Sequence, residues 1–367
     1  MRFCALALLL TACHVAPTAP PASSVSAEAI GSTRNSVVAT PGELAGAPLT
    51  YFAQALDDAE RRELATQAPN LRIVEGLTRE QALARAGEAH GVDGSYATPE
   101  FLRAASRLCW VQARSAGVDR YLSTRELIEN ERIVLTNLRG VHGPAIADHV
   151  FAMLLALTRD LPVHLAGRAS GAWRREGSGE LRGIALQDRT LLVVGLGGIG
   201  SEVARRAHGF GMRVLATRRS DDRAPEFVER VGKPEDLLAF LRESDVVVLC
   251  VPLTPETENL FDARAFDALK PGAFLVNIAR GKVVDTGALV AALRSGKLAG
   301  ACLDVTEPEP LPSDHVLWTF PNVVITPHVA ANAELTDERG SAVLVENLRR
   351  FASGEPLLNV VDKRAGY

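Results

Sequence analysis

The glycine-rich segment Gly195-Leu196-Gly197-Gly198-Ile199-Gly200 constrains the fold of this chain more than any other feature. It directly follows the apolar run Leu191–Val194, and a segment with helical spacing and a second apolar run come after it. This order of strand, glycines, helix and strand within about thirty residues is typical of a dinucleotide-binding unit. The sequence therefore predicts a loop that holds the pyrophosphate of a cofactor.

Each residue of this loop has a physical task. Gly195 permits a tight turn, Gly197 lets the backbone approach a pyrophosphate, and Gly200 lets the helix pack closely on the strand. Gly198 and Ile199 stand where the helix begins, and the amide groups of a helix N-terminus bind phosphate. We expect all five residues to contact the cofactor.

The end of the second strand distinguishes the two nicotinamide dinucleotides. A protein that binds NAD usually places an acidic residue there for the adenosine ribose hydroxyls. This chain has Thr217-Arg218-Arg219-Ser220 instead, without a carboxylate. Guanidinium groups bind phosphate oxygens in a bidentate fork, so the sequence favours NADP(H) over NAD(H). The alternative is that Arg218 or Arg219 is a solvated surface charge and that NAD binds.

Apolar runs alternate with helical segments along most of the chain. Short runs over residues 72–76, 108–112 and 132–136 predict strands in the N-terminal part. Near-continuous runs predict parallel strands covered on both faces in the C-terminal part. Those runs are Thr190–Gly195, Met212–Thr217, Asp245–Val251, Ala273–Ile278, Gly300–Val305 and Val323–Thr326. Helices are expected over residues 79–89, 98–106, 144–160, 234–241, 286–293 and 335–351.

Length and composition narrow the fold and the function. At 367 residues the chain is about twice as long as a usual domain. We therefore predict an α/β fold with two Rossmann-like domains, each a doubly wound parallel sheet, and a cleft between them. The net charge is −4, and Lys and Arg form no basic block, which argues against nucleic-acid binding. The histidines show no metal-ligand spacing, so we expect no metal site.

The N-terminus resembles a bacterial lipoprotein signal. Residues 1–13 combine Arg2, an apolar stretch and Leu10-Thr11-Ala12-Cys13, in which Cys13 is the expected lipidation site. Residues 14–48 are rich in Ala, Pro and Ser and predict a disordered tether. The protein is then a cell-envelope lipoprotein anchored to a membrane through Cys13. The alternative is an unused signal and a cytoplasmic protein, which suits the location of nicotinamide cofactors.

Three polar residues each follow one of the later predicted strands, at the end where open α/β sheets bind ligands. Arg280 is suited to hold a substrate carboxylate and polarise a carbonyl oxygen. His328 is suited to give that oxygen a proton when hydride arrives from a nicotinamide. Glu309 is suited to orient the imidazole and stabilise its protonated form. Together they form a complete set for reducing a 2-keto acid.

These segments together resemble the D-isomer-specific 2-hydroxyacid dehydrogenase family. The resemblance covers roughly residues 50–360, and the matching motifs occur in order along the chain. They are Ser115-Ala116-Gly117-Val118-Asp119, Gly195–Gly200, Val251-Pro252-Leu253-Thr254-Pro255-Glu256-Thr257, Asn277-Ile278-Ala279-Arg280-Gly281, Leu303-Asp304-Val305 with Glu309-Pro310, and Thr326-Pro327-His328.

The resemblance implies roles for particular residues. Arg280, Glu309 and His328 are the implied catalytic residues, and Arg280 also binds the substrate. Asp304 is implied to contact the nicotinamide carboxamide. The amides of Ser115, Ala116 and Gly117 are implied to bind the substrate carboxylate. The residues implied to line the cofactor are Val251, Pro252, Thr257 and Ile278.

The resemblance also implies the domain organisation. The substrate domain comprises residues 49–142 and 330–367, and the dinucleotide-binding domain comprises residues 143–329. The cleft between them closes on the ligands, and two copies associate through the dinucleotide-binding domain.

The implied function is NAD(P)-dependent interconversion of a 2-keto acid and a D-2-hydroxy acid, with glyoxylate or hydroxypyruvate as the expected type of substrate. A phosphorylated or bulky acid is an alternative substrate. A non-catalytic dinucleotide-binding protein on the same fold is an alternative function, although such a protein has no chemical need for Arg280, Glu309 and His328.

Overall fold

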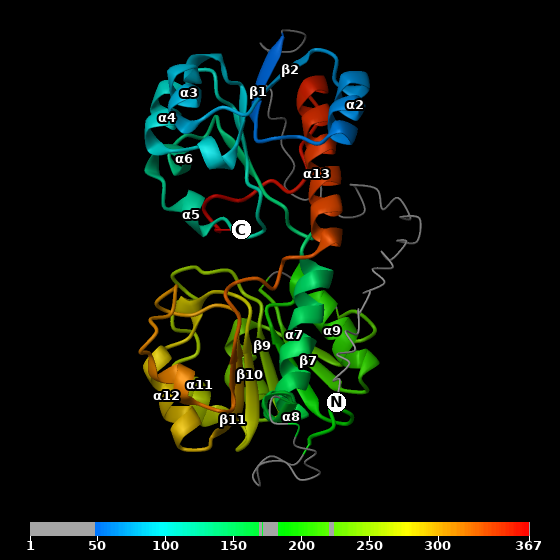
Figure 1. Cartoon of the computed structure of the whole chain (residues 1–367), viewed down its shortest axis with the longest axis vertical. Helices are drawn as coiled ribbons and strands as arrows, with labels where there is room; N and C mark the ends of the chain where they lie inside the picture. Colours follow the sequence, from blue (N-terminus) through cyan, green and yellow to red (C-terminus); the bar gives the residue numbers. More distant parts are fainter. Residues whose placement is uncertain (1–47, 169–170, 172–182, 220–223, 367) are drawn as a thin grey trace, which may run out of the picture.

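The computed structural model describes residues 48–168, 171, 183–219 and 224–366. The predicted signal with Cys13, the predicted tether except Pro48, and Ser220 lie outside the described residues. Figure 1 shows two lobes, each built on a parallel β-sheet with helices around it. We name them the N-terminal lobe, built on residues 49–136, and the central lobe, built on residues 143–325.

The sheet of the N-terminal lobe has the strand order β2-β1-β3-β4-β5, and every neighbouring pair is parallel. The strands are β1 (Leu49–Ala53), β2 (Leu71–Glu75), β3 (Gly91–Asp93), β4 (Trp110–Gln112) and β5 (Val134–Thr136). The helices are α2 (Asp58–Gln67), α3 (Arg79–Ala84), η2 (Ala86–Glu88), η3 (Gly94–Tyr96), α4 (Pro99–Ala104), α5 (Asp119–Leu122) and α6 (Arg125–Ile128).

The sheet of the central lobe has the strand order β12-β11-β10-β9-β6-β7-β8, again all parallel. The strands are β6 (Thr190–Val194), β7 (Arg213–Thr217), β8 (Arg230–Gly232), β9 (Val246–Leu249), β10 (Ala273–Asn277), β11 (Leu298–Leu303) and β12 (Val323–Ile325). The helices are α7 (Gly143–Thr158), α8 (Leu161–Arg168), α9 (Gly198–Gly209), η4 (Pro234–Asp236), α10 (Leu237–Leu241), α11 (Ala263–Ala268), η5 (Gly281–Val283), α12 (Thr286–Arg294) and η6 (Val316–Thr319).

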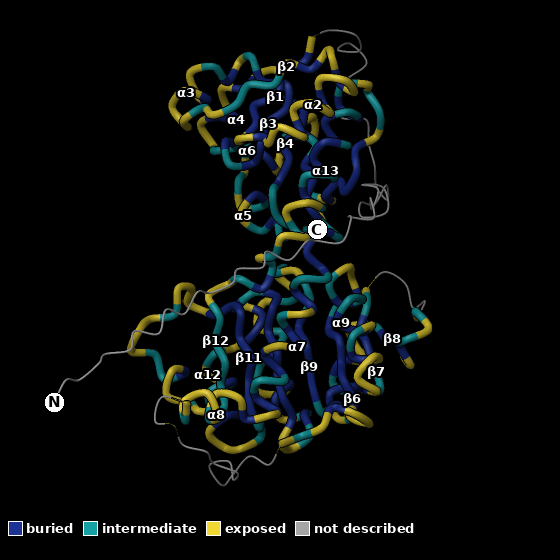
Figure 2. The backbone as a smooth tube through the Cα atoms, turned by 45° about the vertical axis from the view of Figure 1, so that its right-hand side comes forward, coloured by how far each residue is buried: buried dark blue, intermediate teal, exposed yellow. Residues whose placement is uncertain are grey.

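The central strands of both sheets are buried, as the dark tube in Figure 2 shows. Successive residues of β6 belong to different cores: Leu191 and Val193 to one, Leu192 and Val194 to the other. Because side chains alternate across a strand, this pattern requires a layer of helices on each face. The α/β prediction with two doubly wound parallel sheets is confirmed.

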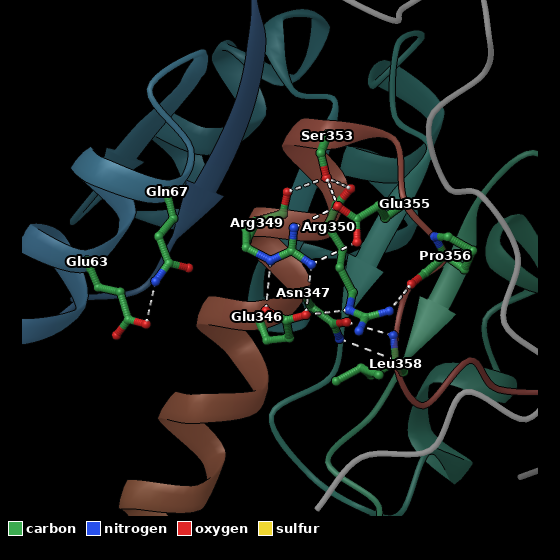
Figure 3. Close-up of polar contacts among 10 residues, drawn as sticks. All are labelled: Glu63, Gln67, Glu346, Asn347, Arg349, Arg350, Ser353, Glu355, Pro356 and Leu358. Atoms are coloured by element: carbon green, nitrogen blue, oxygen red, sulfur yellow. Dashed lines mark hydrogen bonds and ion pairs between the residues drawn. The ribbon is translucent and has the colours of Figure 1, made fainter. Parts of the chain in front are cut away.

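The chain returns to the N-terminal lobe through its last helix, α13 (Glu334–Ser353). Phe351 packs on Trp110 of β4 with the ring centroids 4.9 Å apart. Figure 3 shows the end of α13, where Arg349 forms ion pairs with Glu346 at 2.9 Å and with Glu355 at 2.7 Å. The segment after α13 then pairs antiparallel with β5 through Val360.

The predicted long strands of the central lobe and the predicted helices 144–160 and 335–351 are found, with ends shifted by a few residues. Strands β1, β3 and β8 and helices α2 and α8 are further elements that the apolar pattern did not indicate. Among the described helices, none is by itself long and apolar enough to cross a membrane. Helices α7 and α8 reach that length and apolarity only as a pair, bent by 74° at their junction.

Candidate active site

The glycine-rich loop joins β6 to α9 with the geometry that its sequence predicts. Gly195 has φ +100°, which favours glycine. A Cβ at Gly200 would overlap the carbonyl oxygen of Gly195, whereas a Cβ at Gly197 would meet nothing within 4 Å. Gly197 precedes α9 without a side-chain cap, so the first amides of the helix are open to an anion. The residues present therefore fit a dinucleotide pyrophosphate.

The end of β7 lies against this loop. The carbonyl oxygen of Thr217 accepts hydrogen bonds from the amides of Gly195 at 3.2 Å and Leu196 at 2.9 Å. Arg218 is half-buried and Arg219 is exposed. In the strand order, β7 stands three strands from β10, about 14 Å at the usual strand spacing. The arginines thus belong to a different part of the sheet edge from the implied catalytic residues.

The loop after β9 carries Val251, Pro252 and Thr257. Val251 is close to the glycine-rich loop, since a Cβ at Gly195 would lie 2.9 Å from its Cγ1. The hydroxyl of Thr257 donates to the carbonyl oxygen of Pro252 at 2.6 Å, which folds the loop back on itself. Ile278 follows β10 and is buried. These residues gather along the carboxyl ends of adjacent strands.

Arg280 follows β10 and is held by the turn that Asn277 forms. The side-chain oxygen of Asn277 accepts from the amide of Ala279 at 3.0 Å, and its side-chain nitrogen donates to the carbonyl oxygen of Arg280 at 3.0 Å. A Cβ at Gly281 would overlap the carbonyl oxygen of Thr306, so glycine is required there. The guanidinium of Arg280 extends to the N-terminal lobe and forms an ion pair with Asp119 at 2.9 Å.

His328 and Glu309 form a direct pair. Nδ1 of His328 lies 2.7 Å from Oε1 of Glu309, and both side chains are nearly half exposed, at 47% and 42%. Nε2 of His328 has no partner among the described residues, so it is available to a ligand. Because β10, β11 and β12 are adjacent parallel strands, Arg280, Glu309 and His328 follow neighbouring carboxyl ends of one sheet.

Asp304, at the end of β11, holds the loop that carries His328. One carboxylate oxygen accepts from the Thr326 hydroxyl at 2.7 Å and the Val329 amide at 2.9 Å, and the other accepts from the Ala330 amide at 3.0 Å. A carboxylate oxygen accepts about two hydrogen bonds, so the second oxygen keeps one position for a further donor. That position is compatible with the implied contact to a carboxamide.

In the loop Ser115–Gly117 of the N-terminal lobe, the backbone carbonyl oxygens are already hydrogen-bonded and the backbone amides are open to a ligand. Its carbonyl oxygens accept from the Leu138 amide, the Asn137 side chain and the Ser115 hydroxyl at 3.0, 2.8 and 2.7 Å. None of its three amides donates to a residue that the structure describes. A row of open N–H groups beside the Arg280 guanidinium is an arrangement that binds a carboxylate.

Sequence reasoning did not assign roles to Asn277, Asp119, Thr326 or His149. Nε2 of His149 lies 2.9 Å from the Thr326 hydroxyl, which links α7 to the Asp304 hydrogen bonds. Asn277 lies within one of the family motifs, and its place before a turn is a signal that a sequence carries. The partners of Asp119 and His149 are 161 and 177 positions away, and a single sequence carries no signal for such contacts. Within the described part of the chain, no group of three or more His, Cys, Asp or Glu side chains is arranged to hold a metal ion.

The chain is similar to known enzymes over most of its length. Residues 151–330 match the family model described as D-isomer specific 2-hydroxyacid dehydrogenase, NAD binding domain. A glyoxylate reductase from Thermococcus litoralis is 40% identical over 236 residues, which are 63% of this chain and 70% of the relative.

Solved structures agree with this similarity. A D-isomer specific 2-hydroxyacid dehydrogenase family protein from Aeromonas salmonicida is 37% identical, with a TM-score of 0.75 over 86% of this chain and 100% of the other. An NADPH-dependent glyoxylate/hydroxypyruvate reductase from Sinorhizobium meliloti, in complex with NADP and sulfate, is 28% identical, with a TM-score of 0.70 over 87% of this chain and 99% of the other. The resemblance read from the motifs is thereby confirmed. This chain belongs to the D-isomer specific 2-hydroxyacid dehydrogenase family and is a 2-hydroxyacid dehydrogenase.

Proposed function

We propose that the protein is an NADP(H)-preferring reductase that converts a small 2-keto acid, of the glyoxylate or hydroxypyruvate type, to the D-2-hydroxy acid. The His328–Glu309 pair at 2.7 Å carries this proposal, because an oriented imidazole with an open Nε2 is suited to give a proton to a carbonyl oxygen. The names of the Thermococcus litoralis and Sinorhizobium meliloti relatives support the substrate class. Nothing in the comparisons supports the non-catalytic alternative.

The residues divide the reaction between binding and proton transfer. The open amides of the Ser115–Gly117 loop and Arg280 bind the substrate carboxylate, and Arg280 polarises the carbonyl group. A nicotinamide dinucleotide, held by the glycine-rich loop, would supply the hydride for the carbonyl carbon. His328 gives its Nε2 proton to the carbonyl oxygen, and Glu309 orients the imidazole through Nδ1. In the oxidative direction His328 takes the proton back.

The preference for NADP(H) rests on the end of β7. Arg218 and Arg219 stand where a family member that binds NAD carries a carboxylate, and guanidinium groups suit the 2′-phosphate. The NADP complex of the Sinorhizobium meliloti enzyme supports this proposal.

Initial rates with the full-length protein test the function directly. We expect oxidation of NADPH to be faster than that of NADH with glyoxylate or hydroxypyruvate, compared with pyruvate and phenylpyruvate. His328→Ala should lower kcat by about 10²–10⁴-fold because general acid catalysis is removed. Tight NADPH binding without turnover of any of the four acids would contradict the proposed substrate class.

We also propose that two copies associate through the central lobe. Helix α8 buries none of its residues, and Leu161 and Leu165 are 44% and 65% exposed. Large apolar side chains exposed on one helix are typical of a protein interface. Light scattering after size exclusion should give a dimer, and Leu161→Glu with Leu165→Glu should give a monomer. A monomeric wild type would contradict this proposal.

Finally, we propose that Cys13 anchors the protein to the cell envelope. The Leu10-Thr11-Ala12-Cys13 sequence supports lipidation, and two acyl chains suffice for stable membrane binding. The wild type should sediment with membranes, and Cys13→Ser should be released into the supernatant. A wild type found in the cytoplasmic fraction would contradict the anchor.

A further inference from the structure

Arg280 meets the N-terminal lobe through one carboxylate. Oδ1 of Asp119 accepts hydrogen bonds from Nη2 of Arg280 at 2.9 Å and from Nε at 3.2 Å. Asp119 is the first residue of α5 in the N-terminal lobe, whereas Arg280 follows β10 in the central lobe. The bond therefore spans the two lobes.

The remaining donors of Arg280 can be counted. A guanidinium has five N–H groups. Two donate to Asp119, and one on Nη1 donates to the carbonyl oxygen of Ala279 at 2.7 Å. Among the described residues no other acceptor contacts this side chain, so two N–H groups remain, one on each terminal nitrogen. A terminal pair of this kind fits two oxygens of a 2-keto acid.

The guanidinium of Arg280 lies close to the Ser115–Gly117 loop, as the surroundings of Gly117 show. A Cβ at this position would overlap Nη2 of Arg280 and would lie 2.9 Å from its Cζ. The guanidinium of Arg280 and the carboxylate of Asp119 thus both lie next to Gly117, the last residue of the Ser115–Gly117 loop. Rotation about the last bonds of Arg280 would break its hydrogen bonds to Asp119 and change the direction of its two remaining N–H groups.

We infer that Asp119 is a positioning residue, which holds the Nε–Nη2 edge of the Arg280 guanidinium from the opposite lobe so that the remaining N–H groups on Nη1 and Nη2 face the substrate. This inference rests on the proposed function of Arg280. The side chains are 28% and 39% exposed, and an ion pair this accessible contributes little to stability. Its effect should therefore be seen in the reaction of the keto acid and not in folding.

Asp119→Ala tests this role. Misplacement of a binding group by about 1 Å costs about 10²-fold in rate, so kcat/KM for glyoxylate should fall by about 10²-fold. Asp119→Asn keeps an oxygen at the accepting position, so the loss should be smaller, about tenfold. The dissociation constant of NADPH, measured by fluorescence, and the melting temperature should stay unchanged. Asp58→Asn removes a carboxylate that pairs with Arg61 at 2.8 Å on α2, and this control should behave as wild type.

A double-mutant cycle separates positioning from a general effect of charge. Arg280→Lys keeps the positive charge and loses the Nε and Nη2 edge, so adding Asp119→Ala should change kcat/KM by less than about threefold. Multiplicative losses, or Asp119→Ala with wild-type kcat/KM, would overturn the inference. If Arg280→Lys itself has wild-type activity, the proposed function of Arg280 fails instead.

Discussion

At the scale of single residues, the site depends on backbone geometry as much as on charge. His328 has φ +56°, a left-handed conformation that few residues other than glycine adopt. Its amide donates to the carbonyl oxygen of Asp304 at 2.8 Å, and the Asp304 carboxylate accepts from the next two amides. These bonds hold a strained residue in place, which is a common way to orient a catalytic side chain.

Glu309→Gln tests the pairing that orients His328. The amide keeps the shape of the side chain and an acceptor at 2.7 Å from Nδ1, but it cannot stabilise an imidazolium. We expect kcat for keto-acid reduction to fall by about 10²-fold or more, since loss of the carboxylate partner of a catalytic histidine is costly. Steady-state kinetics check the rate, and NADPH binding should not change. A kcat within twofold of wild type would show that Glu309 is dispensable.

At the scale of elements, the sequence predicted strands where an apolar run is long and buried on both faces. Strand β11 has six residues, all buried except the half-buried Ala299. An apolar run of this length indicates a strand that is covered on both faces. Strands β3 and β8 have three residues each, too few for any periodicity. They exist because neighbouring strands supply their hydrogen bonds, which is tertiary information.

The same limit applies to the site. Arg280, Glu309 and His328 were identifiable because each follows a recognisable strand, and parallel strands bring their carboxyl ends together. The ion pair between Arg280 and Asp119 depends on how two lobes meet, and no local pattern encodes that distance. Sequence thus identifies the residues that gather at one sheet edge more readily than their partners on the other lobe.

The end of β7 gives a prediction at this scale. Arg218→Asp with Arg219→Ala should change the ratio of kcat/KM for NADPH to that for NADH by about 10²-fold toward NADH. The new carboxylate repels a 2′-phosphate and accepts from ribose hydroxyls. Initial rates with both cofactors check it. Arg294→Asp reverses a charge at the end of α12 and should leave the ratio unchanged. An unchanged ratio in the double variant would show that Arg218 and Arg219 do not determine the preference for NADPH.

The segment after α13 gives a prediction about pH. Nζ of Lys363 donates to the carbonyl oxygens of Leu127 at 2.9 Å and Asn130 at 2.8 Å, and burial lowers its pKa to about 8. The unfolded chain holds this proton up to about pH 10.4, so unfolding takes up a proton between these values. Stability should therefore rise with pH from about 8 to 10, by at most about 1.4 kcal/mol per pH unit.

Urea unfolding of the wild type and of Lys363→Gln between pH 7 and 10 measures this contribution. The contributions of other titrating groups cancel in the difference between the free energies of unfolding of the two proteins. The wild type should gain stability relative to Lys363→Gln as pH rises. If the free energies of unfolding of the two proteins changed in parallel from pH 7 to 10, the pKa of Lys363 would not be lowered in the folded protein.

At the scale of the whole molecule, the described part of the chain crosses between the lobes before α7 and again before α13, as Figure 1 shows. Gly140 lies in the first crossing with φ +88°, a conformation that strains any other residue. Its Cα lies 3.6 Å from the position of a Cβ on Gly198, at the start of α9. The first crossing and the glycine-rich loop are therefore in contact. We expect cofactor binding to be coupled to the relative position of the two lobes.

Gly140→Val tests this coupling. A β-branched residue at positive φ costs about 1–2 kcal/mol and should distort the crossing, so KM for NADPH should rise by about tenfold and kcat should fall with it. Small-angle scattering should show the wild type becoming more compact with NADPH and oxamate together, and the variant should lose this change. Gly76→Val, at φ +69° in the N-terminal lobe, introduces the same strain away from the crossing and should keep the compaction. If Gly140→Val compacts as the wild type does, the first crossing does not transmit cofactor binding to the lobes.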